Sequence, residues 1–380
     1  MSEETSDGEA GELGEVFEAG ELGVDAPGRR PRSPLPQAPG LTEWPLLTGE
    51  LEGIGGRLSP LPADFLVDEV PAYAASGEGT HHYVRIEKQG LTTADVRLAL
   101  VTAAGVDPRD VGFAGRKDKH ARTTQWFSLP APAVDPGING LRLLEVTRHA
   151  NKLKLGHLRG NRFQITLVDV SEEAERRLPP LLARLADGFP NAYGEQRFGA
   201  AGRSYDQALR FVAAPRRRVS DPGFLASVIQ AAGFNTWLAA RLRDGLFGKG
   251  IAGDVLKKRD TGGLFVSPDA ETDGPRVERA EVDPTGPMFG RRMFAAEGPS
   301  LLREEVAKAS MPLTVAEWAV VDQWAAGTRR VARVVAEELS ISRTETGLVL
   351  SFFLPSGCFA TVFLAELMHP PGRLRLPIEG

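Results

Sequence analysis

Four segments in the first half of the chain are expected to be strands, and the clearest of them alternate apolar and polar residues, the pattern of strands that bury one face. The clearest is Arg162 to Leu167, in which Phe163 and Ile165 alternate with polar residues. The same alternation is read in 64–69, the segment 82–88 has Val84 and Ile86 on one face, and 124–129 is expected as a further strand. Between the segments 82–88 and 124–129, Thr92 or Thr93 can cap a helix that continues through apolar residues as far as Leu100.

The pattern changes after these strands. Ser171 is expected to cap a helix, which Pro179 and Pro180 interrupt or restart. From about 198 to 329, helical stretches such as 234–246 are separated by loops rich in Gly and Pro. Strand character returns in three segments, 330–335, 348–354 and 358–364. Because strands precede and follow the helical region, we expect an α+β domain made from both chain ends, with a second domain inserted.

Charge is distributed unevenly along the 380 residues. The whole chain carries 45 Lys and Arg against 50 Asp and Glu, but residues 1–28 hold nine of those acids and no Lys or Arg. The remainder is therefore mildly basic, with 45 bases and 41 acids. We expect residues 1–40 to form a disordered acidic tail. The alternative is that this tail screens the basic surface against weak nucleic-acid contacts.

Several classes of protein are excluded by composition. No apolar run approaches the roughly 18–20 residues that span a bilayer, and the acidic N-terminus does not resemble a signal peptide. The single cysteine, Cys358, allows no intrachain disulfide and no cysteine cluster for zinc. These features favour a cytoplasmic protein with no membrane contact and no evident obligatory protein partner.

One carboxylate, Asp118, lies among cations in the run 115–125. The neighbouring cations are Arg116, Lys117, Lys119 and Arg122, with His120 beside them. Nearby positive charge favours the ionised form of an acid. Such an arrangement suits work on a polyanion, because the cations can hold phosphates while the carboxylate does chemistry. The alternative is a basic surface loop in which Asp118 is a turn residue.

A second basic cluster precedes the clearest strand. Its cations are Arg148, Lys152, Lys154, Arg159 and Arg162, and the segment contains no acid. Phosphate contacts would fix the register of a nucleic acid, while Asn161 could hydrogen-bond a base edge and Phe163 could stack on the base. A solvated loop that leads into a core strand, with Phe163 in the core, is the alternative.

Other motifs give no chemistry. The glycines of the segment 191–199 favour a structural loop that joins two domains. The chain has no complete dinucleotide pattern, no Walker-type phosphate loop and no Gly-x-Ser-x-Gly elbow. Its histidines show no metal-ligand spacing. The chemistry is therefore expected to depend on Asp118 and its neighbours.

Taken in order, these segments resemble the TruD family of pseudouridine synthases, from Leu58 to Leu367. The matching segments are 62–65, 115–118 with 124–126, 158–163 and 193–199, then 234–235 with Arg241, 253–255 and 284–287, and finally 352–357 with 360–361. Phe359 stands where the family often has Tyr, and the acidic tail has no expected counterpart.

The resemblance implies a pseudouridine synthase fold in permuted order, in the α+β class, with an inserted second α/β domain. Residues 41–197 and 330–372 would form the catalytic domain, and residues 198–329 would form the inserted TruD-type domain. The implied reaction breaks the N1–C1′ bond of a uridine, turns the base and rejoins it through C5, with no cofactor and no metal.

Site residues follow from the same resemblance. Asp118 would be the essential carboxylate, acting either as a nucleophile or as a base. Phe65, Asn161 and Phe352 match family positions that contact the uridine, Phe163 would line the same pocket, and Lys117 would keep Asp118 ionised. The RNA backbone would be held by Arg116, Lys119, Arg122, Lys152, Lys154, Arg159 and Arg162.

The expected substrate is tRNA, at its thirteenth nucleotide in the D arm, again by resemblance. A pseudouridine synthase that acts on another tRNA site or another RNA is one alternative. A non-catalytic RNA-binding or RNA-folding protein is the other.

Overall fold

The computed structural model describes residues 44–199, 202–215 and 219–370. The tail expected over residues 1–40 lies outside the described residues. The described chain divides into two compact units. Residues 45–192 and 333–370 form the large-sheet unit, and residues 193–332 form the helical unit.

The large-sheet unit contains most of the strands. These are β1 (Gly55–Leu58), β2 (Phe65–Pro71), β3 (His81–Lys88), β4 (Gly112–Phe113), β5 (Arg122–Leu129), β6 (Leu141–His149), β7 (Leu158–Val170), β8 (Phe189–Pro190), β13 (Arg333–Val334), β14 (Glu337–Arg343) and β15 (Gly347–Pro355). Its helices are α1 (Thr93–Ala104), α2 (Ala174–Arg184) and α8 (Ala360–Met368). The four predicted strands of the first half are confirmed as β2, β3, β5 and β7.

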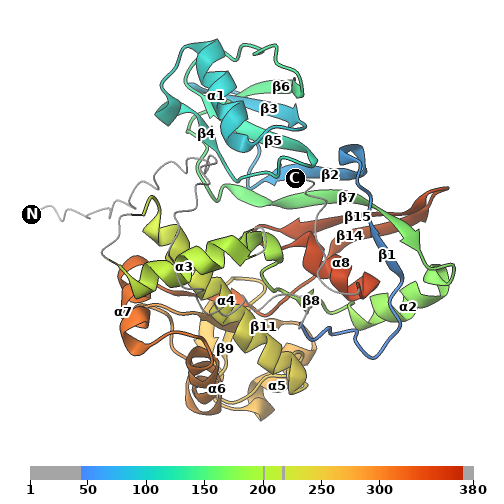
Figure 1. The fold of residues 1–380 in the computed structure, drawn as a ribbon, viewed down its shortest axis with the longest axis vertical. Coiled ribbons are helices and arrows are strands. Elements are labelled where there is room, and N and C mark those ends of the chain that lie inside the picture. Colours follow the sequence, from blue (N-terminus) through green and yellow to red (C-terminus); the bar gives the residue numbers. More distant parts are fainter. Residues whose placement is uncertain (1–43, 200–201, 216–218, 371–380) are drawn as a thin grey trace, which may run out of the picture. The chain divides into compact units, whose positions relative to one another are not determined.

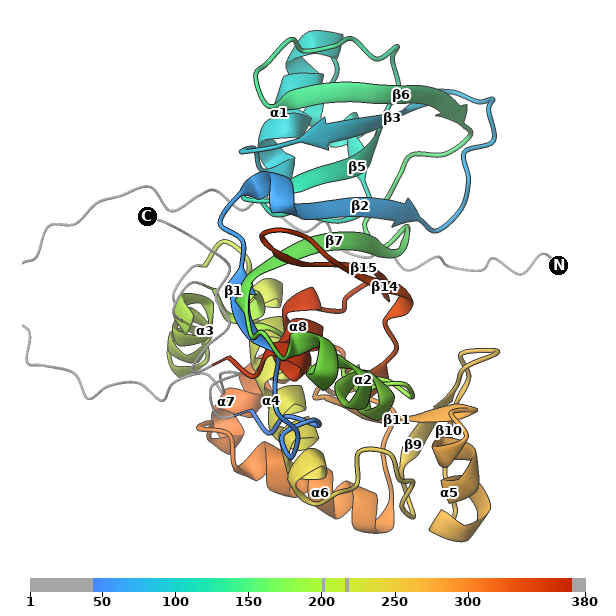
Figure 2. The same cartoon turned by 90° about the vertical axis from the view of Figure 1, so that its right-hand side faces the viewer.

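One mixed sheet runs through this unit in the order β14-β15-β7-β2-β5-β3-β6 (Figures 1 and 2). The pairing of β2 with β5 is parallel, and the other pairs of this series are antiparallel. β1 pairs with β7, and β4 pairs with β5. The short strands β8 and β13 pair with each other. The sheet therefore joins strands from both ends of the chain.

Two helices pack on the same face of this sheet, at opposite ends of the strand order. Val96 and Leu100 of α1 pack against Val84, Ile86 and Phe127 of β3 and β5. At the other end, Phe363 of α8 contacts Phe352 of β15 with ring centroids 5.0 Å apart. Figure 1 shows α1 beside β3 and β5, and α8 beside β15. Between these ends, the same face is carried by β2 and β7.

The start of α1 confirms the predicted cap. The side chain of Thr92 accepts a hydrogen bond from the backbone N–H of Asp95, and Asp95 accepts one from the backbone N–H of Thr92. This reciprocal capping box satisfies donors that the first helical turn leaves unpaired. It fixes where α1 begins, and with it the position of Thr93.

The strand predicted over 358–364 is wrong, because Ala360–Met368 is the helix α8. Every residue of α8 is buried, so its sequence is apolar on all sides and shows no helical period. A short apolar run of this kind does not distinguish a buried strand from a buried helix. The helix also buries Glu366, whose carboxylate accepts hydrogen bonds from the backbone N–H groups of Leu47 and Thr48.

Two other boundaries differ from the prediction. The helix expected to start at Ser171 begins at Ala174, and it continues through Pro179 and Pro180. The Ser171 hydroxyl instead accepts a hydrogen bond from the N–H of Glu173. The single strand expected over 330–335 is two strands, because Thr328–Val331 pairs with residues 285–288 and Arg333–Val334 pairs with β8.

The helical unit has a smaller sheet and most of the helices. Its elements are α3 (Arg203–Ala213), α4 (Pro222–Arg243), β9 (Val255–Lys258), β10 (Leu264–Val266), α5 (Ala270–Glu278), β11 (Val282–Met288), α6 (Gly298–Ala309), α7 (Val315–Trp324) and β12 (Thr328–Val331). The strand order is β10-β9-β11-β12. Buried residues of α3, α4 and α7 form its main apolar core. The predicted helix over 234–246 is the second half of α4.

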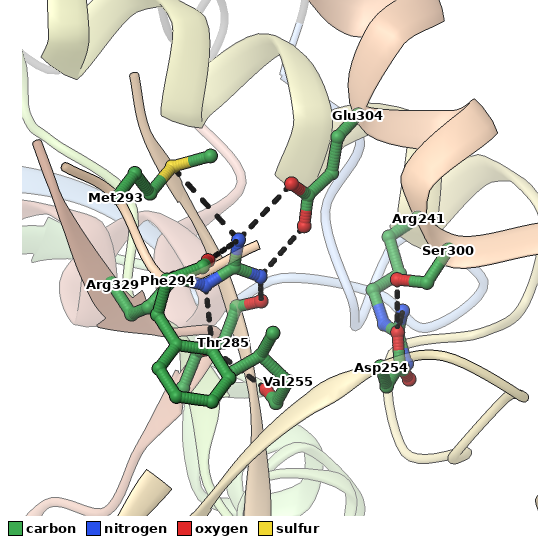
Figure 3. A network of polar contacts seen from close by, with 9 residues as sticks. All are labelled: Arg241, Asp254, Val255, Thr285, Met293, Phe294, Ser300, Glu304 and Arg329. Atoms are coloured by element: carbon green, nitrogen blue, oxygen red, sulfur yellow. Dashed lines mark hydrogen bonds and ion pairs between the residues drawn. The ribbon is translucent and has the colours of Figure 1, made fainter. Parts of the chain in front are cut away.

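Two buried ion pairs fasten the elements of the helical unit (Figure 3). The guanidinium of Arg241 lies 2.6 Å from Oδ2 of Asp254, and Ser300 donates a hydrogen bond to Oδ1 of the same carboxylate. The guanidinium of Arg329 binds both oxygens of Glu304, at 2.6 and 3.0 Å. All four charged side chains are at most 2% exposed. Each pair ties a helix to the small sheet or to the loop that enters it.

Candidate active site

One row of residues crosses the large sheet and defines its central face. Lys88 of β3 pairs with Thr123 of β5, which pairs with Val67 of β2. Val67 pairs with Phe163 of β7, which pairs with Phe352 of β15. Residues paired in register point to the same side of a sheet. Five strands that are far apart in the sequence thus present one continuous face between α1 and α8.

The next positions on this face are polar. Two residues along β2 from Val67, Glu69 pairs with Asn161 of β7. Two residues along β5 from Thr123 is Gln125, which is fully buried. Its side chain donates a hydrogen bond to the backbone oxygen of Gly115. The centre of the face therefore carries charged and amide groups, although both ends are packed with apolar side chains.

The segment 114–121, which carries Asp118, is fastened over this face by hydrogen bonds. The N–H of Lys117 donates to the hydroxyl of Thr93 at 2.9 Å. The backbone oxygen of Asp118 accepts a hydrogen bond of 2.6 Å from Nζ of Lys88. The backbone oxygen of Lys119 accepts one from the N–H of Gly90. A segment without helix or strand is thus held by β3, by β5 and by the start of α1.

The Asp118 side chain is exposed at this place. Its Oδ1 accepts a hydrogen bond of 2.9 Å from the N–H of His120, the geometry of a local Asx turn. This contact is the one expected if Asp118 is a turn residue. It is also compatible with a catalytic role, because the carboxylate remains accessible.

Lys117 points to a different carboxylate from the one expected. Its Nζ lies 2.5 Å from Oε2 of Glu69, and the two side chains are 5% and 1% exposed. The other oxygen of Glu69 accepts a hydrogen bond from the N–H of Trp126. Burial raises the pKa of the Glu69 carboxyl, and the Lys117 ammonium opposes that rise. Lys117 therefore anchors the segment beside Asp118 through Glu69.

The predicted base-binding residues differ in exposure. Phe163 is half-buried and stacks on Phe352, with ring centroids 5.4 Å apart and planes inclined by 24°. Phe352 is only 2% exposed, because it is packed between Phe163 and Phe363. Phe65 is half-buried on the same face. Among the described residues, the buried Oδ1 atom of Asn161 has no hydrogen-bond partner.

The predicted RNA-backbone cations fall into separate groups. Arg116 and Lys119 flank Asp118 and are exposed. Arg122 and Arg162 lie on the opposite face of the sheet, paired with Glu87 and Glu338. The three others are also placed by the structure: Lys152 donates to the backbone oxygen of Arg109, Arg159 lies 3.4 Å from Glu337, and Lys154 is exposed.

Sequence reasoning missed Glu69, Lys88, Gln125 and Thr93. A signal for two of them was present in the strand pattern. Glu69 is in phase with Val67, and Lys88 is in phase with Val84 and Ile86, so both charges fall on the buried face. A charged residue at a buried phase of a strand needs a partner, and here each has one.

In the part of the chain that the structure describes, no group of three or more His, Cys, Asp or Glu side chains could hold a metal ion. Within the same ranges, no helix is both long enough and apolar enough to cross a membrane.

The fold of this chain is similar to that of a solved structure. A crystal structure of a Methanosarcina mazei protein, described as tRNA pseudouridine synthase D (TruD), superimposes with a TM-score of 0.66 at 21% identity. The match covers 86% of this chain and 97% of that one. The expected α+β class with the pseudouridine synthase fold is confirmed.

Sequence comparison defines the family. The family model of tRNA pseudouridine synthase D (TruD) matches residues 43–207 and 201–367. A tRNA pseudouridine synthase D of Anaeromyxobacter sp. is 48% identical over 348 residues, which is 88% of this chain and 98% of that protein. One from Thermus thermophilus is 39% identical, over 86% of this chain and 92% of that protein. The chain belongs to the TruD family, and it is an isomerase.

Proposed function

We propose that this enzyme isomerises a uridine of tRNA to pseudouridine at the central face of its large sheet, with Asp118 as the essential carboxylate. The observation that carries the proposal is the pairing of Lys117, the neighbour of Asp118, with Glu69 of β2, whose cross-strand partner is Asn161 of β7. The thirteenth nucleotide, in the D arm, is the proposed target. No cofactor takes part.

The chemistry needs the base outside its helix, in reach of a carboxylate. Phe163 supplies an aromatic surface on which a flipped uracil can stack. Phe352, which is buried, stacks on the Phe163 ring and holds that ring in place. The unpaired Oδ1 of Asn161 is an acceptor that suits the N3–H donor of uracil. Phe65, on the neighbouring strand, completes the apolar wall.

The predicted cations would bind phosphates of the RNA in two groups. Arg116 and Lys119 flank the proposed catalytic carboxylate and are free to meet phosphates beside the flipped nucleotide. Arg162 lies on the opposite face of the sheet, so we assign it, with the half-exposed Arg159, to phosphates of the RNA backbone away from the flipped nucleotide, where the surface carboxylates can be exchanged for phosphates. The helical unit is the proposed inserted domain.

Incubation of the purified protein with unmodified bulk tRNA, without added metal or cofactor, tests this function. Carbodiimide labelling followed by primer extension maps any new pseudouridine. A single stop in the D arm at the thirteenth nucleotide is expected. Stops elsewhere would keep the reaction and replace the target, and the absence of stops with folded protein would overturn the proposal.

A further inference from the structure

Lys88 is a charged side chain in the interior of the large-sheet unit. It is the last residue of β3, and it is 1% exposed. Lysine is seldom buried to this extent, because the transfer of an unpaired ammonium out of water is costly. A buried lysine therefore needs partners, and the identity of these partners indicates what it does.

Both partners of Lys88 are backbone oxygens of segments without regular structure. Its Nζ donates to the oxygen of Leu91 at 2.7 Å and to the oxygen of Asp118 at 2.6 Å. Leu91 lies in the turn between β3 and α1. Asp118 lies in the segment 114–121. One ammonium thus joins the main chain of two segments that no strand pairing connects.

The surroundings of the ammonium are mixed in charge. Asp118 and Lys117 face it from the segment 114–121, and Asp95 faces it from α1. The residues paired with Lys88 on the adjacent strands are neutral, Thr123 on β5 and Leu141 on β6. Burial lowers the pKa of Lys88 to about 8, while the Asp118 carboxylate opposes that fall. The ammonium is thus protonated at neutral pH, and it loses its charge in the mildly alkaline range.

We infer that Lys88 is a positioning residue for Asp118: among the contacts that hold the segment 114–121, its ammonium is the one bound to the main chain of Asp118 itself, and it does not touch the RNA. The inference rests on the proposed role of Asp118. Since Lys88 is buried, its loss should leave RNA affinity unchanged. A carboxylate displaced by about 1 Å loses on the order of 100-fold in rate, so the effect should fall on kcat.

The pH profile provides a second consequence. A hydrogen bond from a charged donor is about twice as strong as one from a neutral donor. As pH rises through about 8, Lys88 loses its charge and its hold on the Asp118 oxygen weakens. The kcat of the native enzyme should therefore fall as pH rises above about 8. This alkaline limb of the pH profile should be caused by deprotonation of Lys88.

The test compares Lys88→Met, which removes the donor, and Lys88→Arg, whose charge does not titrate in this range. Lys257→Met, an exposed lysine on β9 of the helical unit, is the matched control. Rates of pseudouridine formation on a tRNA transcript are measured from pH 6 to 9.5, with KM, RNA affinity and thermal unfolding for each variant. Wild type and Asp118→Asn are run in parallel.

Lys88→Met is expected to lose about 100-fold in kcat, with KM and RNA affinity within about threefold, and to lack the alkaline limb. Lys257→Met should match the wild type. A kcat for Lys88→Met within about threefold of wild type, a parallel rise of KM, or an unchanged alkaline limb would overturn the inference. If Lys88→Met does not fold, Lys88→Arg decides, because a retained alkaline limb in that variant also overturns it.

The parallel proteins separate this inference from the proposed function. An inactive wild type, or an active Asp118→Asn, would mean that the proposed function is wrong. An active wild type and an inactive Asp118→Asn, together with a normal Lys88→Met, would remove only the role of Lys88.

Discussion

Nζ of Lys117 lies 2.5 Å from Oε2 of Glu69, and both side chains are buried beneath the segment that carries Asp118. The two residues are 48 positions apart in the chain. A buried pair of this kind contributes little when it is intact, but it is costly to break, because the remaining charge has no partner. The pair fixes the residue that directly precedes the proposed catalytic carboxylate.

Glu69→Gln should therefore lower the free energy of unfolding by about 3 kcal/mol, since it leaves the Lys117 ammonium buried without a carboxylate. Urea unfolding followed by circular dichroism measures the change. The control is Asp68→Asn, at the adjacent residue, whose pairing with Arg85 involves side chains that are 32–39% exposed. That change should cost about 1 kcal/mol or less. Equal losses of unfolding free energy in the two variants would show that the buried Glu69–Lys117 pair is no more costly to break than the partly exposed pair of Asp68 and Arg85.

Phe163→Ala should lower kcat/KM about 10- to 100-fold, because stacking contributes about 1–3 kcal/mol per base. The matched control is Gln164→Ala, the next residue of β7, which is exposed and points to the opposite face. Steady-state rates on a tRNA transcript and thermal unfolding are measured for both. A loss of cooperative unfolding in Phe163→Ala alone would instead show that Phe163 serves the core.

In the helical unit, Arg329→Met should cost about 3–5 kcal/mol at pH 7, because it leaves the Glu304 carboxylate buried and unpaired. Arg303→Met, which removes a pairing with the half-exposed Asp244, should cost about 1 kcal/mol or less. Urea unfolding at pH 7 compares the two.

The same variant has a defined pH dependence. Burial raises the pKa of Glu304, and the Arg329 guanidinium opposes that rise, so its removal raises the pKa further. A carboxyl whose pKa is higher in the folded state binds its proton more tightly there, and stability increases as pH falls toward that pKa. The deficit of Arg329→Met should therefore shrink between pH 7 and pH 5. A constant or growing deficit would contradict this account.

The strands of the central face and the cation-rich run around Asp118 could be predicted from the sequence. The strands depend on the local pattern of apolar and polar residues, and the run is visible from its charges. The helix α8 could not be predicted in this way, because a helix that is buried on all sides has no polar face and therefore shows no helical periodicity in its sequence. The sequence also did not identify the partner of Lys117, because the pairing with Glu69 depends on which strands become neighbours in the sheet.

The alternation along a strand also predicts which face of the sheet a charged residue occupies. Arg122 and Arg162 lie within cation-rich segments, yet the alternation of β5 and β7 directs them away from Asn161 and Phe163. Lys88 could have been identified from its phase with Ile86, but its contact with Asp118 requires the path of a segment that has no regular structure.

The most direct test of the account is turnover by Asp118→Asn on a tRNA transcript labelled with tritium at C5 of uracil, since pseudouridine formation releases that tritium to water. The substitution keeps the size of the side chain and removes its charge. We predict no release above background, with RNA affinity within about threefold of wild type and an unchanged thermal unfolding transition. Release at a rate near that of the wild-type enzyme would contradict the central claim, because the reaction would then not depend on the Asp118 carboxylate.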